Sequence, residues 1–272
     1  MINAEKSHYL FANLSWKDLA ALQQKGNLVL LLPIGSTESH GPHAPLSTDA
    51  LISSEVCLRS ARSLTEKGHR ALVLPTLTYA VTECARSFPG TISISPEVDS
   101  GIISDICLSL IRQDMTRICL FNSHFEPTHV QCIYDAIERV EKNSGVRVAF
   151  TDVTRKKYSS QLPSAFQRGE THADRYETSA IMAIDPSLVN EERRKALPCL
   201  PISLVDKLFK EKLTDFLEFG MEESYCGDPA SATREEGVKI LGTLSRLVVE
   251  DAEKLLLGTQ TPLDQGLYGR ER

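Results

Sequence analysis

Short apolar runs and longer segments of helical periodicity alternate along the first part of the chain. The apolar runs span residues 28–34, 70–74, 117–121 and 146–150, and the helical segments span residues 16–25, 48–67, 96–114 and 127–142. Runs this short and this apolar are typical of parallel strands that are buried on both faces. Strands that alternate with helices form right-handed βαβ units. The pattern therefore predicts an α/β fold with three layers, α/β/α, around a mostly parallel sheet.

Residues beyond 155 follow the alternation less closely. Helical periodicity returns at residues 176–184 and 233–257, with polar sequence before the first of these segments. The chain contains no internal repeat and no low-complexity linker that would mark a domain boundary. We therefore expect residues 1–272 to form a single domain.

Charge and hydropathy exclude several classes of partner. The net charge is −6, and the lysines and arginines are scattered along the chain, which argues against a nucleic-acid surface. No stretch approaches the roughly 18 apolar residues of a membrane span, and the first residues lack the basic run and apolar core of an export signal. We therefore expect a cytoplasmic protein that binds neither nucleic acid nor membrane.

Acidic and histidine side chains follow the predicted strands. In an open parallel sheet, ligands bind outside the carboxyl ends of the strands, so the residues that follow each strand meet at one edge. The loop 35–49, the segment 79–91 and the loop 122–126 should converge there. Two of these loops hold Glu38, His40, Asp49, His124 and Glu126.

These five side chains carry the ligands that Mn²⁺ and Zn²⁺ prefer, namely carboxylate oxygen and neutral imidazole nitrogen. The pairs Glu38/His40 and His124/Glu126 are each spaced i, i+2, which on extended backbone places both side chains on one side. Asp49 could bridge two ions, and a water shared by two ions becomes hydroxide near neutral pH. Residue types alone leave simpler explanations open, namely polar surface loops and an N-cap role for Asp49 at the next helix.

Five segments resemble the sequence signature of the creatininase (creatinine amidohydrolase) family and occur in the family's order. They are residues 33–49 (PIGSTESHGPHAPLSTD), 87–91 (SFPGT), 122–126 (NSHFE), 172–179 (HADRYETS) and 227–237 (GDPASATREEG). Together they are far more specific than any one of them. The resemblance implies a creatininase-like fold, an amidohydrolase activity and two divalent ions per chain, zinc or manganese, with iron as a further candidate.

The resemblance also implies which side chains hold each ion. One ion would be held by Glu38, Asp49 and His124. The other would be held by His40, Asp49 and Glu126. Asp49 would thus be shared between the two.

Two further residues would act in catalysis according to the resemblance. His172 would be the proton shuttle, because a neutral imidazole can take a proton during attack and return it to the leaving nitrogen. Glu177 would orient His172 or a metal ligand from behind. The simpler alternatives are a packed structural histidine and a first-turn glutamate favoured by the helix dipole.

The substrate contacts are expected from segments near this edge, and they are Thr82, Glu83, Arg86, Phe125 and Glu170. Arg86 could pair with a carboxylate or phosphate of an anionic substrate. Creatininases resemble one another in carrying tryptophans that cover the small planar ring, whereas the single tryptophan of this chain, Trp16, lies in the first predicted helix. Because that aromatic cover is missing, we expect a substrate other than creatinine.

The activity that we expect is hydrolysis of a C–N bond in a cyclic or linear amide by a hydroxide bound to two metal ions. One alternative is a formamide deformylase that acts on a nucleobase or sugar-phosphate intermediate, which Arg86 as a phosphate contact would favour. Another is a non-catalytic family member used for binding, against which the complete set of five ligands argues. The family typically assembles as hexamers, so the resemblance implies a homo-oligomer.

The remaining histidines lack a partner pattern. We expect His43 to buttress the first loop and not to be a ligand. We expect His8, His69 and His129 to be surface or helix-face residues.

Overall fold

The computed structural model describes residues 8–259, so residues 1–7 and 260–272 of the expected single domain lie outside the described residues. Its strands are β1 (Leu28–Ile34), β2 (Arg70–Val73), β3 (Ile118–Asn122) and β4 (Ala149–Thr151). They form one parallel sheet in the order β2-β1-β3-β4.

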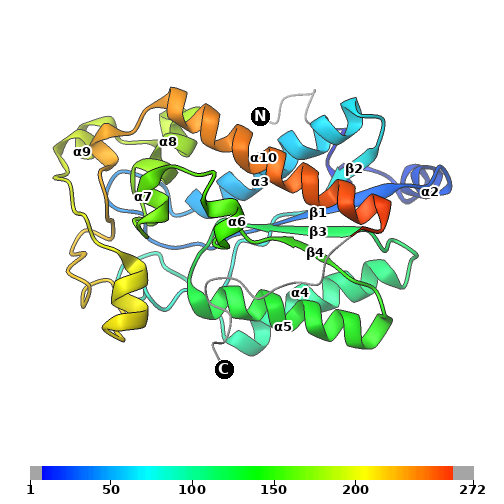
Figure 1. The fold of residues 1–272 in the computed structure, drawn as a ribbon, viewed down its shortest axis with the longest axis horizontal. Coiled ribbons are helices and arrows are strands. Elements are labelled where there is room, and N and C mark those ends of the chain that lie inside the picture. Colours follow the sequence, from blue (N-terminus) through cyan, green and yellow to red (C-terminus); the bar gives the residue numbers. More distant parts are fainter. Residues whose placement is uncertain (1–7, 260–272) are drawn as a thin grey trace.

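Helices cover both faces of this sheet (Figure 1). In chain order, the α-helices of the described residues are α2 (Trp16–Gln24), α3 (Thr48–Glu66), α4 (Pro96–Ile111), α5 (Pro127–Ser144), α6 (Lys156–Ser159), α7 (Ser164–Gln167), α8 (Arg175–Ile184), α9 (Glu191–Ala196) and α10 (Arg234–Leu257). Of these, α3 and α10 pack on one face of the sheet and α4 and α5 on the other. Single turns of other helical types lie at Phe11–Asn13, Pro186–Leu188, Asp206–Lys210 and Pro229–Ser231. The three-layer α/β/α architecture predicted from the sequence is confirmed. Among the described residues, no helix is both long and apolar enough to cross a bilayer.

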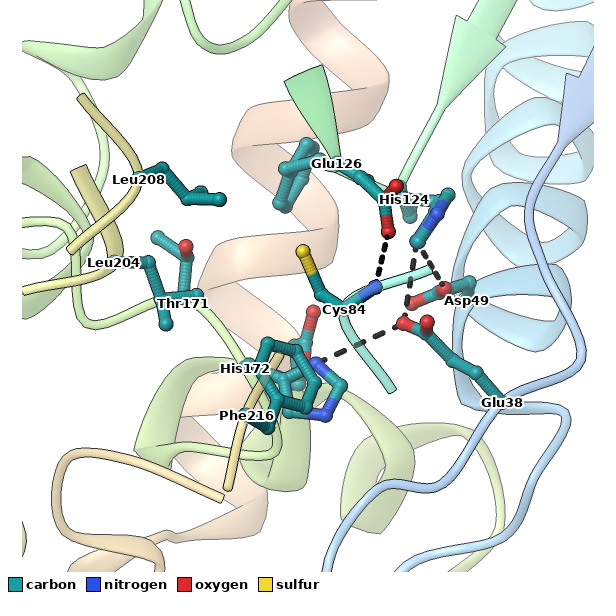
Figure 2. Close-up of a pocket in the computed structure, with 13 residues that line it drawn as sticks. Glu38, Asp49, Cys84, His124, Glu126, Thr171, His172, Leu204, Leu208 and Phe216 are labelled. Atoms are coloured by element: carbon teal, nitrogen blue, oxygen red, sulfur yellow. Dashed lines mark hydrogen bonds and ion pairs between the residues drawn. The ribbon is translucent and has the colours of Figure 1, made fainter. Parts of the chain in front are cut away.

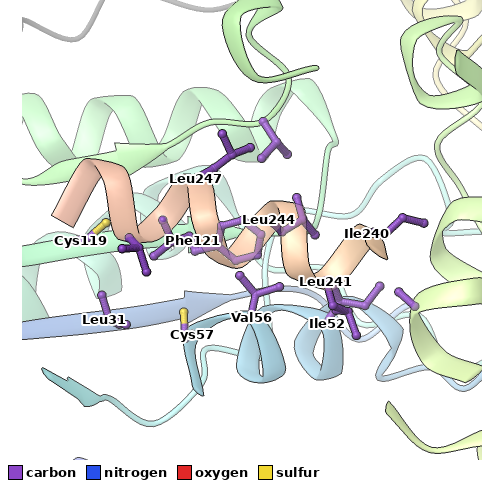
Figure 3. Packing of buried hydrophobic residues seen from close by; sticks show 14 of the residues in the cluster. Leu31, Ile52, Val56, Cys57, Cys119, Phe121, Ile240, Leu241, Leu244 and Leu247 are labelled. Carbon is purple, nitrogen blue, oxygen red and sulfur yellow. The ribbon is translucent and has the colours of Figure 1, made fainter. Parts of the chain in front are cut away.

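The side chains of β1 alternate between two hydrophobic cores. Val29 and Leu31 pack against α3 and α10, as Figure 3 shows for Leu31, and Leu30 and Leu32 pack against α4 and α5. Successive strand residues point to opposite faces, so a strand covered on both faces must be apolar at every position. This explains why the run LVLLLPI is apolar throughout.

The predicted elements are confirmed with small shifts at their ends. β4 begins at Ala149 because the amide of Val146 donates to the hydroxyl of Ser144, within the turn that ends α5, instead of pairing with β3. Helices α6, α7 and α9 were not predicted, since helices of one or two turns are too short to show a period.

The direction of winding reverses at β1, which lies between β2 and β3. Ile34 and Asn122, the last residues of β1 and β3, are register partners. The loops that follow these two strands therefore start side by side. This is the switch point at which doubly wound sheets bind their ligands.

Close packing of α10 on α8 fixes the third segment that reaches this edge. A Cβ at Gly237 would lie 1.8 Å from the carbonyl oxygen of Ser179. Only glycine permits this approach. The contact holds the start of α8, and with it Glu177, against the sheet.

Candidate metal centre

The loop after β1 is seated directly on the start of α3. A Cβ at Gly35 would lie 2.6 Å from the backbone nitrogen of Ala50, so a side chain there would push the strand off the helix. This close approach brings Asp49 beside Glu38 and His40, all of them buried. Backbone packing thus brings together His40 and Asp49, which are nine residues apart in the sequence.

Asp49 does not cap α3. The helix begins at Thr48 with Ser47 in the capping position, so Asp49 lies inside the first turn. Its Oδ2 accepts a hydrogen bond from the hydroxyl of Ser36 at 2.9 Å. The N-cap explanation left open by the sequence is therefore wrong, and the carboxylate faces the site.

Three groups of possible ligand atoms converge here, with the atoms of each group within 4.8 Å of one another. The groups are Glu38/Asp49/His124, which Figure 2 shows, His40/Asp49/Glu177 and Glu38/His40/His172. Asp49 Oδ2 lies 3.2 Å from His124 Nδ1, and Asp49 Oδ1 lies 3.1 Å from His40 Nε2. Each oxygen of Asp49 thus belongs to a different group, as a bridging carboxylate requires.

The spacing of these atoms fits a divalent ion in each of the first two groups. Two ligand atoms that are each about 2.1 Å from a tetrahedral ion lie about 3.4 Å apart. His124 Nδ1 lies 3.2 Å from Glu38 Oε1, and His40 Nε2 lies 3.5 Å from Glu177 Oε2. The donor chemistry, carboxylate oxygen with imidazole nitrogen, suits zinc and manganese.

Backbone carbonyls fix the tautomer of both candidate histidine ligands. His40 Nδ1 donates to the carbonyl of Glu38 at 3.1 Å, and His124 Nε2 donates to the carbonyl of Val81 at 2.8 Å. The other nitrogen of each ring therefore carries the lone pair that faces the carboxylates. Such support from behind raises the basicity of a ligand and holds its orientation.

The sequence resemblance implies that Glu126 is a ligand and that Glu177 lies behind the ligands, and the positions of the two side chains can be compared with this expectation. Glu177 lies with His40 and Asp49, whereas Glu126 is in none of the three groups. Glu126 Oε2 instead accepts a hydrogen bond from the amide of Cys84 at 3.0 Å, and its carboxylate lines the cavity. Glu177 reaches the site because Ala173, at φ +47°, turns the chain inward and donates its amide to Glu177 Oε2 at 2.6 Å.

The site gathers four acidic side chains that are largely out of contact with water. Its four carboxylates, Glu38, Asp49, Glu126 and Glu177, are each at most 8% exposed. Burial alone would lower the pKa of His40, but the charges of Asp49 and Glu177 raise it to about 10. Imidazoles in such surroundings hold protons unless metal ions take their place.

His172 stands at the open side of the ligand groups. Its Nε2 donates to the carbonyl of Ser39 at 2.9 Å, and its Nδ1 lies 3.7 Å from Glu38 Oε1. Burial, and next the charge of His40, lower the pKa of His172 to about 4. The ring is therefore a neutral base at physiological pH, with its free lone pair directed into the site.

A cavity that is open to solvent lies beside these residues. Its lining includes polar site residues and an apolar wall, and consists of Glu38, Asp49, Cys84, Ser123, His124, Phe125, Glu126, Thr171, His172, Glu177, Leu204, Leu208 and Phe216. Of the five expected substrate contacts, Phe125 lines this cavity. The wall from residues 204–216 was not predicted, because its apolar residues follow no clear period.

The other four expected contacts lie outside the lining. Thr82 donates its hydroxyl to Glu38 and so supports a ligand, while Glu83 is exposed. Arg86 pairs with Asp215, with Nε 3.3 Å from Oδ2. Glu170 pairs with the guanidinium of Arg168, which lies two residues away.

His129 lies in α5 and is fully buried, so of the two positions expected for it, surface or helix face, the surface is wrong. Its Nδ1 lies 2.6 Å from Asp99 Oδ2, and its Nε2 lies 3.2 Å from Asn122 Oδ1. Asn122 Oδ1 in turn accepts a hydrogen bond from the backbone amide of His124. The i, i+5 spacing to His124, across a loop and a helix start, gave no periodic signal. By contrast, His43 buttresses the first loop as expected, through a 2.9 Å hydrogen bond to Thr178.

The arrangement behind His124 leads to a prediction. Changing His129 to alanine leaves the buried carboxyl of Asp99 without its imidazole partner and removes one contact that holds Asn122. We expect a loss of roughly 3 kcal/mol in unfolding free energy and a 10- to 100-fold loss in metal affinity. Denaturant titration and metal-competition titration measure the two effects. His69→Ala, at a partly exposed histidine remote from the site, is the control, and equal metal affinity in both variants would contradict the prediction.

Comparison with known proteins agrees with this geometry. The family described as "Creatininase: Creatinine amidohydrolase" matches residues 12–251. The creatinine amidohydrolase of Pseudomonas putida is 30% identical over 197 residues, which cover 66% of this chain and 73% of that protein. The mycofactocin precursor peptide peptidase of Mycobacterium ulcerans (strain Agy99) is 29% identical over 220 residues, 79% of this chain and 80% of that protein.

Solved structures give the same result. A crystal structure of creatinine amidohydrolase (creatininase) superposes with a TM-score of 0.72 at 26% identity, over 89% of this chain and 95% of that chain. A structure described as "Creatininase Mn" has the same TM-score at 25% identity, over 89% and 96%. The chain therefore belongs to the creatininase family and is a hydrolase that acts on carbon–nitrogen bonds.

Proposed function

We propose that the chain hydrolyses a C–N bond of an amide at a site that binds two divalent cations. The observation that carries the proposal is the position of Asp49, whose two oxygens face two separate groups of ligands. Glu38 and His124 would complete one cation site, and His40 and Glu177 the other. When bound there, the cations would polarise the amide carbonyl and activate a water molecule as nucleophile.

The protein's own groups would position the reactants and move the proton. His172 Nδ1 would take a proton from the attacking water and return it to the leaving nitrogen, which a neutral imidazole fixed by Ser39 can do. Glu126 faces the cavity with one oxygen held by Cys84. Its carboxylate would accept a further hydrogen bond from the substrate or the water.

A deformylase acting on a sugar phosphate is less well supported. Its phosphate was expected to meet Arg86, which is engaged by Asp215 and lies outside the lining. Among the described residues that line the cavity, none is a lysine or arginine. A non-catalytic role is disfavoured by the complete ligand groups and by the poised base His172.

Metal analysis joined to a hydrolysis screen tests the function. Purified protein should hold close to two ions of zinc or manganese per chain. With Mn²⁺ or Zn²⁺ present, lactams, creatinine-like rings, formamides and short peptides should be screened for release of amine or carboxylate. A protein that binds fewer than one ion per chain and hydrolyses none of these substrates would contradict the proposal.

Removal of metal should lower the thermal stability. Ions present at about 1,000 times their dissociation constant stabilise by about 4 kcal/mol each, and a domain of this size loses roughly 2–4 °C in Tm per kcal/mol. We therefore expect a chelator to lower Tm by roughly 10 °C or more, and added Mn²⁺ or Zn²⁺ to restore it. A Tm unchanged by chelation of protein shown to contain metal would be the opposite result.

A further inference from the structure

The apolar wall of the cavity comes from a segment that the proposed reaction does not use. Residues 200–221, here called the cap segment, contribute Leu204, Leu208 and Phe216 to the lining. In Figure 2 the two leucines lie across the cavity from the metal ligands, and Phe216 lies beside His172. The ring centroids of Phe216 and His172 are 4.3 Å apart. An apolar surface therefore directly adjoins the group that would move the proton.

The cap segment is tied to the site at several points. The amide of Phe216 donates to the carbonyl of Cys84 at 2.8 Å. Asp215, only 4% exposed, accepts a hydrogen bond from the hydroxyl of Ser87 at 2.7 Å and pairs with Arg86. The amide of Leu204 donates to the carbonyl of Gly169 at 2.9 Å. These bonds hold the wall in place before any ligand arrives, which lowers the entropy lost on binding.

The charges around the cavity select against anionic ligands. Its four carboxylates would be balanced by two divalent ions, and the lining described above holds no cationic side chain. A carboxylate or phosphate group on the substrate would lose its hydration on entering the cavity and would find no cationic side chain there. Its desolvation would therefore be costly. The wall itself offers only contacts that favour hydrocarbon.

We propose, resting on the function proposed above, that the substrate is an uncharged amide with a branched-aliphatic or aromatic substituent next to the scissile C–N bond. This substituent packs against Leu204, Leu208 and Phe216. The cap segment thus determines specificity by excluding water and charge beside His172. A small polar ring would leave this wall uncovered.

Binding of hydroxamates tests the proposal without requiring turnover, because this group chelates divalent ions whatever the natural substrate. The metal-loaded protein would be titrated with acetohydroxamate, isovalerohydroxamate, phenylacetohydroxamate and the monohydroxamate of succinate. Each buried methylene contributes about fourfold in affinity. We expect isovalero- and phenylacetohydroxamate to bind roughly 10- to 60-fold more tightly than acetohydroxamate, and the succinate compound more weakly than isovalerohydroxamate.

Variants of the wall locate the effect. Leu204→Asn and Leu208→Asn should each lower the isovalero-to-aceto affinity ratio to less than about a third of its wild-type value. Leu217→Asn is the matched control, since Leu217 lies on the same segment but is 49% exposed and does not line the cavity. Because both wall residues are only half-buried, the variants should fold, and circular dichroism checks this.

The failures of the two proposals can be told apart. A protein that binds metal and acetohydroxamate but shows no preference for apolar substituents, or prefers the succinate compound, would overturn the inference and leave the proposed function standing. A preference that both wall variants retain would also overturn it. A protein that binds no metal would overturn the proposed function, and the inference would fall with it.

Discussion

Replacing Asp49 with asparagine is expected to remove at least one of the two metal ions and to lower kcat by about 10³-fold or more. The amide keeps the shape of the side chain, but it loses the charge and one of the two oxygens that face His40 and His124. Loss of a cation removes several kcal/mol of transition-state stabilisation. Metal content by mass spectrometry and initial rates on whichever substrate the screen identifies measure the two effects.

A buried carboxylate outside the site provides the control for this variant. Asp251 in α10 accepts hydrogen bonds from Thr151 at 2.9 Å and from Tyr158 at 2.6 Å. Asp251→Asn should lower stability by about 1–3 kcal/mol, while metal content and kcat stay within about twofold of wild type. If Asp49→Asn kept two ions and full activity, the bridging role would be wrong.

Glu177→Gln is expected to have the second-largest effect, and it should differ in kind from Glu126→Gln. Glu177 lies with His40 and Asp49, so its neutral variant should lose one ion per chain and nearly all activity. Glu126 is hydrogen-bonded to Cys84 and belongs to no ligand group. Glu126→Gln should therefore retain both ions, while kcat falls by about 10²-fold through the loss of a charged contact in the cavity.

The comparison of these two variants separates the sequence resemblance from the tertiary geometry. The resemblance placed Glu126 among the ligands and Glu177 behind them. Loss of an ion from Glu126→Gln with full retention in Glu177→Gln would support that assignment and contradict the structure. His40→Ala should lose one ion under either assignment. It is therefore the positive control, which shows that the assay can detect the loss of one ion.

The fold could be predicted because its determinants are local. A strand such as β1 must be apolar at every position when both of its faces are covered, and this leaves a short continuous run that is visible in the sequence. The location of the site followed, since loops after parallel strands meet at one edge. Elements of one or two turns, such as α6 and α9, could not be found, because their stability comes from packing and not from a period.

Residue type and order in the chain determined the acidic and histidine set that gathers after β1 and β3. Only the tertiary structure decided which member of the set faces which neighbour. Glu177 joins His40 because the left-handed turn at Ala173 and the contact of Gly237 with Ser179 aim the start of α8 at the sheet. His129 is buried behind His124, and the cap segment forms an apolar wall beside His172. These contacts join residues far apart in the sequence or across an irregular turn, and their energy depends on distances that no periodicity encodes.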